Sequence, residues 1–309
     1  MAKKSGLQIN IEYAAFRAAF FLIGILPRKA AIRVCSAAFK LSARFVPRAK
    51  NVGLKNLSLA FPELDDAERR RILIGSFESL GRVVGELSQF HKYTPETLAD
   101  IIDFSFDEET EALYKRVKNE KRGVLLVTGH FGNWEILVLA FAALYEPISY
   151  LARPLDNPKI EELLSSLRMR FGNTPINKSN SAMTAISVLK TKFGLGILAD
   201  VNAHPREGVF VPFFGVPACT PTGAAMIAIR SNAYLYPVAC VWDKEKSRYR
   251  FIHGKLMETA NTGDRKRDVL ETTAAFTAEL ESLIRQYPEQ WMWTHKRWKT
   301  RPPGEDPIY

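Results

Sequence analysis

The sequence is poor in cysteine, and its three cysteines form no motif. Cys35, Cys219 and Cys240 show no C-x-x-C spacing, so nothing indicates a zinc ribbon or a dithiol redox site, and free thiols favour a reducing compartment. The five histidines are scattered, whereas a metalloprotease helix carries two of them at i and i+4. We therefore expect neither a metal ion nor a cofactor.

The sequence also lacks the motifs of nucleophilic catalysis. It has no G-x-S-x-G elbow, and none of its cysteines stands in a recognisable catalytic context. The chemistry that this leaves open is general-base catalysis, in which a histidine takes the proton of a substrate hydroxyl.

Long hydrophobic runs are missing as well. The N-terminal apolar stretch at residues 18–26 lies between Arg17 and Pro27 and is much shorter than the ~20 residues with which a helix crosses a bilayer. No convincing small-residue cleavage site follows it, and an uncleaved signal-like anchor is the alternative. The chain shows no internal repeat, low-complexity tract or convincing interdomain linker.

Positive charge is concentrated at the N-terminus. The net charge is +10, and residues 1–50 contain ten Lys or Arg against the single acidic residue Glu12. On a helical projection of residues 30–46, Arg33, Lys40 and Arg44 align beside an apolar stripe. This pattern predicts a basic amphipathic helix on an anionic membrane surface, with a helix packed on the domain as the alternative. We expect no nucleic-acid partner, because the segment has no recognised binding motif.

The rest of the chain predicts an α/β fold. With 309 residues, 47% of them apolar, it can bury a large core, and Asp65 with Glu68 three residues later predicts a capped helix start. Strand and helix patterns then alternate. We expect strands at 123–128, 147–152, 195–199, 234–242 and 249–252, and helices at 133–145, 157–171, 181–192, 220–231 and 266–286. Such alternation predicts a mixed, substantially parallel central sheet flanked by helices.

The most informative segment follows the first of these strands. It reads Gly129-His130-Phe131-Gly132-Asn133-Trp134-Glu135 and places a histidine and a carboxylate where an apolar strand ends. In α/β sheets the carboxyl ends of the strands open into the crevice that binds ligands. The segment therefore predicts a general base and a supporting acid at the mouth of the sheet.

Two further strands end in charged residues. One ends at Arg153 and the other at Asp200, so three strand exits deliver complementary groups to one edge of the sheet. After Asp200, the connection at residues 208–215 is unusually apolar and includes Phe213 and Phe214. It predicts either a buried hairpin or the wall of a lipid-binding cleft, and under the second interpretation the two phenylalanines contact substrate.

Taken together, these motifs resemble the bacterial lipid A biosynthesis acyltransferase family, the late lauroyl and myristoyl transferases of the lysophospholipid acyltransferase superfamily. The resemblance spans roughly residues 50–305 and rests on Thr128-Gly129-His130-Phe131-Gly132-Asn133-Trp134-Glu135, Ala152-Arg153-Pro154-Leu155-Asp156-Asn157-Pro158, residues 208–215, Thr220-Pro221-Thr222-Gly223, and residues 288–293 and 298–305. It implies a glycerol-3-phosphate acyltransferase-like fold, with residues 1–50 as a membrane-associating segment and residues 51–309 as the catalytic domain. One departure is Val201 after Asp200, where many relatives carry Gln.

The resemblance also implies roles for the residues at the strand ends. His130 would be the general base, and either Glu135 or Asp200 would hold its imidazole. Arg153 would stabilise the oxyanion or hold a substrate phosphate, and the backbone N–H groups near Gly132 and Asn133 compete for the first of these tasks.

The implied reaction transfers an acyl chain from acyl carrier protein or acyl-coenzyme A to a hydroxyl of a lipid A precursor or related glycolipid. The enzyme would lie peripherally or monotopically on the cytoplasmic face of the inner membrane. The alternatives are an acyltransferase for a phosphatidylinositol mannoside or a lysophospholipid, and a noncatalytic lipid-binding protein. Trp291, Trp293 and Trp298 lie among cationic residues, which predicts either a headgroup interface or a structural clamp.

Overall fold

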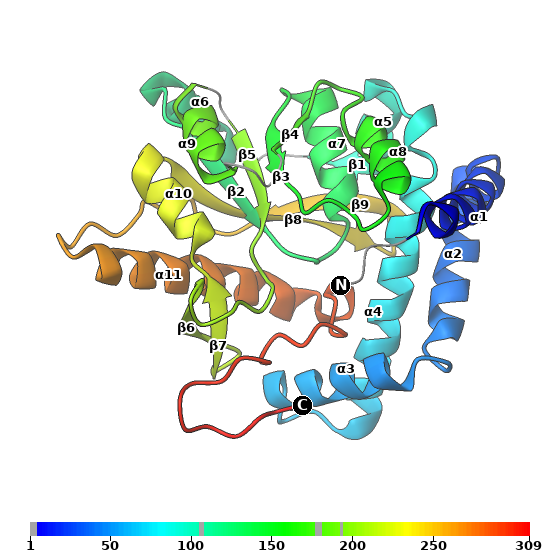
Figure 1. The fold of residues 1–309 in the computed structure, drawn as a ribbon. Coiled ribbons are helices and arrows are strands. Elements are labelled where there is room, and N and C mark those ends of the chain that lie inside the picture. The colour runs from blue at the N-terminus through cyan, green and yellow to red at the C-terminus, as the bar shows by residue number, and fades with distance from the viewer. Residues whose placement is uncertain (1–4, 105–107, 177–180, 192–193) are drawn as a thin grey trace.

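The computed structural model describes residues 5–104, 108–176, 181–191 and 194–309. Its centre is a seven-stranded sheet with the strand order β1-β9-β8-β2-β5-β3-β4 (Figure 1). All neighbouring strands are parallel except β8 and β9. The strands are β1 (Ile102–Asp103), β2 (Val124–Thr128), β3 (Ser149–Leu151), β4 (Thr174–Ile176), β5 (Gly194–Leu198), β8 (Tyr234–Asp243) and β9 (Arg248–His253). The expected α/β fold with a mainly parallel sheet is confirmed.

Helices cover both faces of this sheet, which explains why its central strands are apolar throughout. Along β2, Val124 and Leu126 face one buried cluster and Leu125 and Val127 face another. The first face is covered by α5 (Pro95–Ile101), α6 (Glu108–Glu120), α7 (Trp134–Leu144) and α8 (Pro158–Arg168). The second is covered by α9 (Ser181–Thr191), α10 (Gly223–Ser231) and α11 (Arg265–Gln286). Figure 1 shows α7 above the sheet and α11 below it.

The described chain begins with four long helices: α1 (Gly6–Gly24), α2 (Arg28–Ser42), α3 (Pro47–Ala60) and α4 (Asp66–Leu87). The capping box of Asp65 and Glu68 at the start of α4 is confirmed. Helix α2 packs closely along α4 at Gly81. A Cβ atom at this position would lie only 2.5 Å from the Cys35 carbonyl oxygen, so the close approach requires glycine. None of the described helices combines the length and the apolar character that crossing a bilayer requires.

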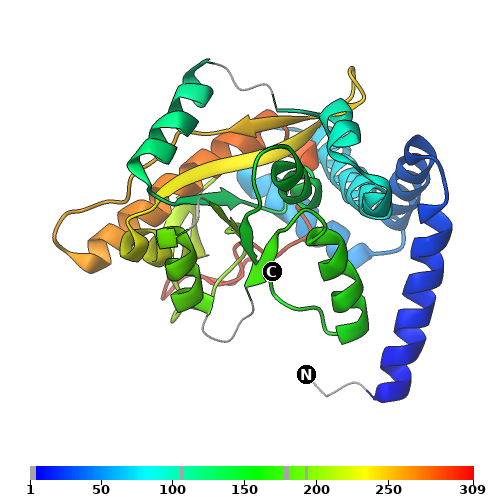
Figure 2. The ribbon, with the colours of Figure 1, turned by 90° about the horizontal axis from the view of Figure 1, so that it is seen from above.

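The N-terminal helices are packed on one side and exposed on the other. Ala31, Ile32 and Cys35 of α2 are buried, so the interpretation of a packed helix holds for that side. The remaining surface exposes large apolar side chains, namely Leu7, Ile11, Phe21, Leu22, Ile25, Val34, Leu41 and Phe45. Helix α1 lies beside α8 in both views, and the Asn157 side chain donates to the Ile9 carbonyl oxygen (Figures 1 and 2).

A separate antiparallel hairpin, β6 (Gly208–Phe213) and β7 (Val216–Pro221), packs against the C-terminal segment. Its turn is formed by Phe214 and Gly215, both with positive φ, as a tight turn requires. Phe213 and Phe214 are buried in a cluster with Trp291, Trp293 and Trp298. Residues 208–215 therefore form a hairpin whose two phenylalanines are buried under a clamp of tryptophans, and the lipid-binding interpretation stays a prediction.

The structure corrects several element boundaries. Thr220 and Pro221 belong to β7, so the helix expected from residue 220 begins only at Gly223. Between the helices expected at 157–171 and 181–192 lies the short strand β4, for which no strand was expected. Residues 177–180, and the expected helix end at residue 192, lie outside the described residues. The short 3-10 helices η1 (Phe90–Lys92) and η2 (Pro288–Gln290) complete the described elements.

Candidate active site

The site forms where β2 and β5 end side by side. The two strands are parallel neighbours, with Thr128 paired with Leu198, so the residues that follow them emerge together. The Asp200 carboxylate accepts twice from His130: Oδ1 lies 2.9 Å from the imidazole Nδ1, and Oδ2 accepts from the backbone N–H at 2.7 Å. Gly129 permits this approach, because a Cβ atom there would lie 2.8 Å from Asp200 Oδ2. The convergence of these two strand exits is confirmed.

A third donor completes the carboxylate's surroundings. The Trp291 indole N–H donates to Asp200 Oδ2 at 2.8 Å, and the side chain of Asp200 is only 4% exposed. Burial alone would raise the pKa of Asp200, but the charge and hydrogen bonds of His130 and the bond from Trp291 lower it to about 2. Asp200 is therefore a permanently ionised acceptor at neutral pH.

His130 keeps part of its imidazole accessible, with 24% of the side chain exposed. Burial lowers the pKa of His130, but the charge and hydrogen bond of Asp200, with a smaller effect of Glu135, outweigh it and raise the pKa above its ordinary value. Because Asp200 only accepts, the proton of a neutral imidazole is held on Nδ1. The Nε2 lone pair is then left to take a proton from another molecule.

The described hydrogen bonds of the Glu135 carboxylate go to Arg168 and not to the imidazole. Glu135 lies in the first turn of α7 and forms a bidentate ion pair with Arg168 of α8, with oxygen to nitrogen distances of 2.6 and 2.7 Å. The pair raises the pKa of Arg168 against the opposing effect of burial. Of the two carboxylates that the sequence offers, the partner of His130 is thus Asp200, and Glu135 joins two helices instead.

The backbone N–H groups of Gly132 and Asn133 are already paired. Gly132 donates to the Gln290 carbonyl oxygen at 2.9 Å, and Asn133 donates to that of Cys240 at 2.7 Å. Gly132 has φ +61°, and a Cβ atom there would lie 2.1 Å from the Cys240 oxygen, so this turn requires glycine. These contacts anchor the loop that carries His130, and oxyanion binding by either residue stays a prediction.

The remaining predicted residues lie at different depths. Arg153 follows β3, the neighbour of β5 at the same edge of the sheet, and its side chain is exposed. Phe213 and Phe214 are buried beneath the site, where Phe213 packs edge-on against Trp291. Phe213 therefore supports the tryptophan that holds Asp200, and Phe214 packs against Phe213 and Trp293. Contact of either phenylalanine with a substrate stays a prediction.

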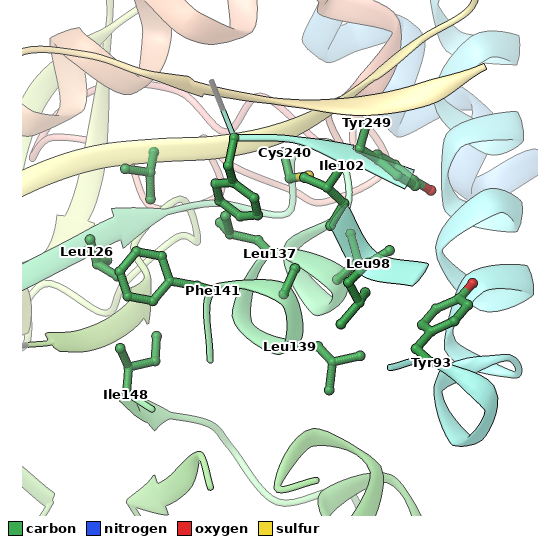
Figure 3. Close-up of a cluster of buried hydrophobic side chains, with 14 of the residues drawn as sticks. Tyr93, Leu98, Ile102, Leu126, Leu137, Leu139, Phe141, Ile148, Cys240 and Tyr249 are labelled. Atoms are coloured by element: carbon green, nitrogen blue, oxygen red, sulfur yellow. The ribbon is translucent and has the colours of Figure 1, made fainter. Parts of the chain in front are cut away.

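Two cavities lie between α7 and the sheet. The proximal cavity is lined by Thr128, Trp134, Glu135, Val138, Tyr150, Leu151, Ala152, Arg168, Gly196, Ile197 and Leu198. The distal cavity is lined by Thr110, Tyr114, Val117, Val124, Leu126, Thr128, Leu137, Val138, Phe141, Ile148, Gly196, Tyr236, Val238, Phe251 and Leu256. Figure 3 shows Leu126 beside Phe141 with Ile148 close to them, three apolar side chains of the distal wall.

One wall residue of the proximal cavity contacts the His130 imidazole. Trp134 lines this cavity, and the Trp134 ring packs edge-on against the imidazole with 5.1 Å between the ring centres. The distal cavity follows it, because Thr128, Val138 and Gly196 line both. A base at the strand exit is therefore followed by a largely apolar space that continues under α7.

Sequence reasoning missed two members of this site. The sequence predicted Trp291 only as part of an aromatic and cationic cluster. Its hydrogen bond to Asp200 joins positions that are far apart in the chain. Arg168 lies near the C-terminal end of an amphipathic helix, where a surface cation is common. Its pairing with Glu135 depends on how α8 packs on α7.

Comparison with known proteins identifies the family. The family model for bacterial lipid A biosynthesis acyltransferases matches residues 3–300. The chain is 32% identical to the lipid A biosynthesis lauroyltransferase of Escherichia coli K12, over 94% of this chain and 92% of the relative. It is 29% identical both to the palmitoleoyltransferase of the same strain and to a lipid A biosynthesis acyltransferase of Shigella flexneri, over 86% of this chain and 83% of each relative. The protein therefore belongs to the bacterial lipid A biosynthesis acyltransferase family.

Proposed function

We propose that this acyltransferase moves a fatty acyl chain from a thioester, carried by acyl carrier protein or acyl-coenzyme A, to a hydroxyl of a lipid A precursor. The observation that carries the proposal is the His130–Asp200 pair, which leaves imidazole Nε2 available beside an apolar cavity. The names of the relatives support the lipid A precursor as the acceptor.

His130 acts as the general base in this reaction. Its Nε2 takes the proton of the acceptor hydroxyl while the hydroxyl oxygen attacks the thioester carbonyl carbon. The tetrahedral intermediate then expels the thiolate, which receives the proton from the imidazolium, so an ester and a free thiol are formed. Asp200 stabilises the imidazolium through Nδ1 and fixes the tautomer.

Arg153 supplies a cation for the substrate. Its side chain is exposed at the edge of the sheet where His130 and Asp200 emerge, and it forms no ion pair with any residue that the structure describes. An exposed, uncompensated guanidinium suits a lipid phosphate or a developing oxyanion, because its planar fork can donate two hydrogen bonds.

The acyl chain of the donor occupies the proximal and distal cavities. Its carbonyl carbon stays near His130 while the hydrocarbon passes Trp134 and continues under α7. The distal walls are almost entirely aliphatic and aromatic, so each methylene placed there leaves water favourably.

The test replaces His130 with Ala in the full-length protein. Labelled acyl carrier protein and acyl-coenzyme A are offered with a lipid A precursor, and the products are identified by mass spectrometry. We expect turnover to fall by about 100-fold or more, since a general base is lost. The control is His204→Ala, which changes an exposed histidine. Near-normal turnover in folded His130→Ala would overturn the mechanism, and exclusive acylation of a lysophospholipid would overturn the acceptor.

We further propose that α1 and α2 hold the enzyme peripherally on the cytoplasmic face of the inner membrane. In α2 the exposed apolar side chains Val34 and Leu41 directly follow the exposed cations Arg33 and Lys40, and α1 exposes Phe21 and Leu22. An anionic bilayer attracts such cations while the apolar side chains enter the headgroup region.

Vesicle flotation tests this attachment. Reversing Arg33, Lys40 and Arg44 to Glu should weaken binding to anionic vesicles, and added salt should have the same effect on the wild type. The matched control reverses three exposed lysines elsewhere, Lys246, Lys255 and Lys266. Equal flotation of the two triple variants would contradict the assignment to the N-terminal helices.

A further inference from the structure

The far end of the distal cavity adjoins a polar hollow on the surface. That hollow is lined by Thr110, His253, Gly254, Lys255, Leu256, Glu279, Ser282, Leu283 and Gln286. Thr110 and Leu256 line both spaces, so these two residues stand between an apolar interior and a water-accessible exterior. The chain of cavities that begins near His130 is therefore closed at its far end by only a few side chains.

The closure is held by hydrogen bonds. Thr110 Oγ1 lies 3.0 Å from His253 Nε2, and the other ring nitrogen of His253 lies 3.0 Å from the Gly254 carbonyl oxygen. On the outer side, the Glu279 carboxylate accepts from the Lys255 backbone N–H at 3.1 Å. Leu256 adds an apolar side chain on the inner side. Beyond this closure a hydrocarbon chain would meet polar groups and water, which give no burial energy.

Gly196 lines both the distal and the proximal cavity, as Thr128 and Val138 also do. A Cβ atom at Gly196 would lie 3.7 Å from Ile148 Cδ1 and 3.8 Å from Tyr150 Cβ, which are ordinary contact distances. A methyl group at this position is thus compatible with the fold, and it would stand where the proximal and distal cavities join. A larger side chain would separate the two cavities.

We propose that the closure formed by Leu256 and the Thr110–His253 pair sets the longest acyl chain that the enzyme accepts, and that Gly196 keeps the passage to it open. This inference rests on the proposed function, because it assigns the acyl chain to the two cavities. The length of the selected chain is then decided far from the reacting atoms, by a residue that touches only the end of the hydrocarbon.

The experiment measures kcat/KM for saturated acyl donors from about 8 to about 18 carbons, each offered as the acyl carrier protein and the coenzyme A thioester. For the wild type we expect about a fourfold rise per added methylene while the chain still enters the distal cavity, followed by a fall. In Leu256→Ala, kcat/KM should stay level for the longer donors and not fall, because longer chains can pass into the hollow without gaining burial. Leu256→Trp should move the fall to shorter chains.

Gly196→Val gives a second, independent test. It should abolish the preference for long donors, so that the ratio of kcat/KM between long and short donors falls toward one, because burial beyond the passage is lost. The matched controls are Gly223→Ala, at a glycine with open space around it, and Leu270→Ala, at an exposed leucine of α11. Thermal unfolding of each variant identifies any that fails to fold.

The outcomes separate this inference from the proposed function. Variants of Leu256 that transfer acyl chains with the wild-type length profile would overturn the closure while leaving the enzyme's activity intact. A wild-type protein that acylates no lipid A precursor from a donor of any length would overturn the proposed function itself. A shifted length profile in the Leu256 variants, with unchanged profiles in both controls, supports the proposal.

Discussion

Two ion pairs lie near the same edge of the sheet, and they differ in what each can do. The pair of His130 and Asp200 is held by three hydrogen bonds to one buried carboxylate, two of them from His130 and one from Trp291. The pair of Glu135 and Arg168 is a bidentate contact between α7 and α8. An imidazole exchanges its proton near neutral pH, whereas a guanidinium does not. The first pair can therefore carry proton transfer, and the second serves to hold two helices together along the proximal cavity.

The largest effect should follow from Asp200→Asn. The amide oxygen would accept from the His130 backbone, so the amide N–H₂ would face Nδ1 and force the imidazole proton onto Nε2. We expect kcat to fall by at least about 100-fold, as in His130→Ala, because the same base is disabled. The double variant His130→Ala/Asp200→Asn should lose nothing more. Multiplicative losses in the double variant would mean that the two residues act separately.

Arg153→Ala should reduce kcat/KM by at least about tenfold, since a fixed cation for a phosphate or oxyanion is removed. Arg153→Lys should retain more of the wild-type kcat/KM than Arg153→Ala but not all of it, because an ammonium keeps the charge but lacks the planar fork. Thermal stability should not change, as the side chain is exposed. The control is Arg265→Ala at the start of α11, which is also exposed. Wild-type kinetics in Arg153→Ala would place this residue outside the site.

Glu135→Gln should act mainly on stability. It leaves the largely buried Arg168 without its ionic partner, so we expect a loss of about 2 kcal/mol in the free energy of unfolding, measured by urea denaturation. Turnover should stay within about threefold of the wild type. Replacing both residues with Gln should recover part of the stability, because no unpaired charge then remains. A loss of turnover as large as that of Asp200→Asn, at unchanged stability, would give Glu135 a direct part in catalysis.

The smallest effect should be a shift in the pH profile. Because the pKa of His130 is raised, the neutral base forms only at higher pH, and kcat/KM should rise with a midpoint above 6.5. Trp291→Phe removes one donor from Asp200, which makes the carboxylate more basic and should move this midpoint upward. The matched control is Trp293→Phe, whose indole N–H donates to the Pro288 carbonyl oxygen. A midpoint that moves equally in both variants would mean that packing alone is responsible.

The sequence was sufficient to bring His130 and Asp200 to one edge, because both follow apolar strands of a parallel sheet. It could not decide between Asp200 and Glu135. That choice depends on strand order and on α7 beginning at Trp134, which places Glu135 in the first turn against α8. Strand β4 was missed because three residues with a central Pro175 give no periodic pattern, and such a proline is tolerated at the edge of a sheet.

The burial of Phe213 and Phe214 could not be predicted either. A protein core and a lipid-binding surface favour the same side chains, so an apolar connection has the same sequence in both cases. The outcome is decided by the C-terminal segment, whose tryptophans cover the hairpin. The packing of these tryptophans on the hairpin involves residues far apart in sequence, so no local periodicity predicts it.

The segment that follows α11 makes the site dependent on the order of synthesis. Trp291 pairs as an isolated bridge with Phe131, the Met292 N–H donates to the His130 carbonyl oxygen, and Gln290 accepts from Gly132. These residues are translated long after the strands that they complete. A nascent chain can therefore have its parallel strands in place while the loop of His130 still lacks its anchor and Asp200 its third donor. The surroundings of the His130–Asp200 pair are therefore complete only after this late segment has left the ribosome and packed on the strands.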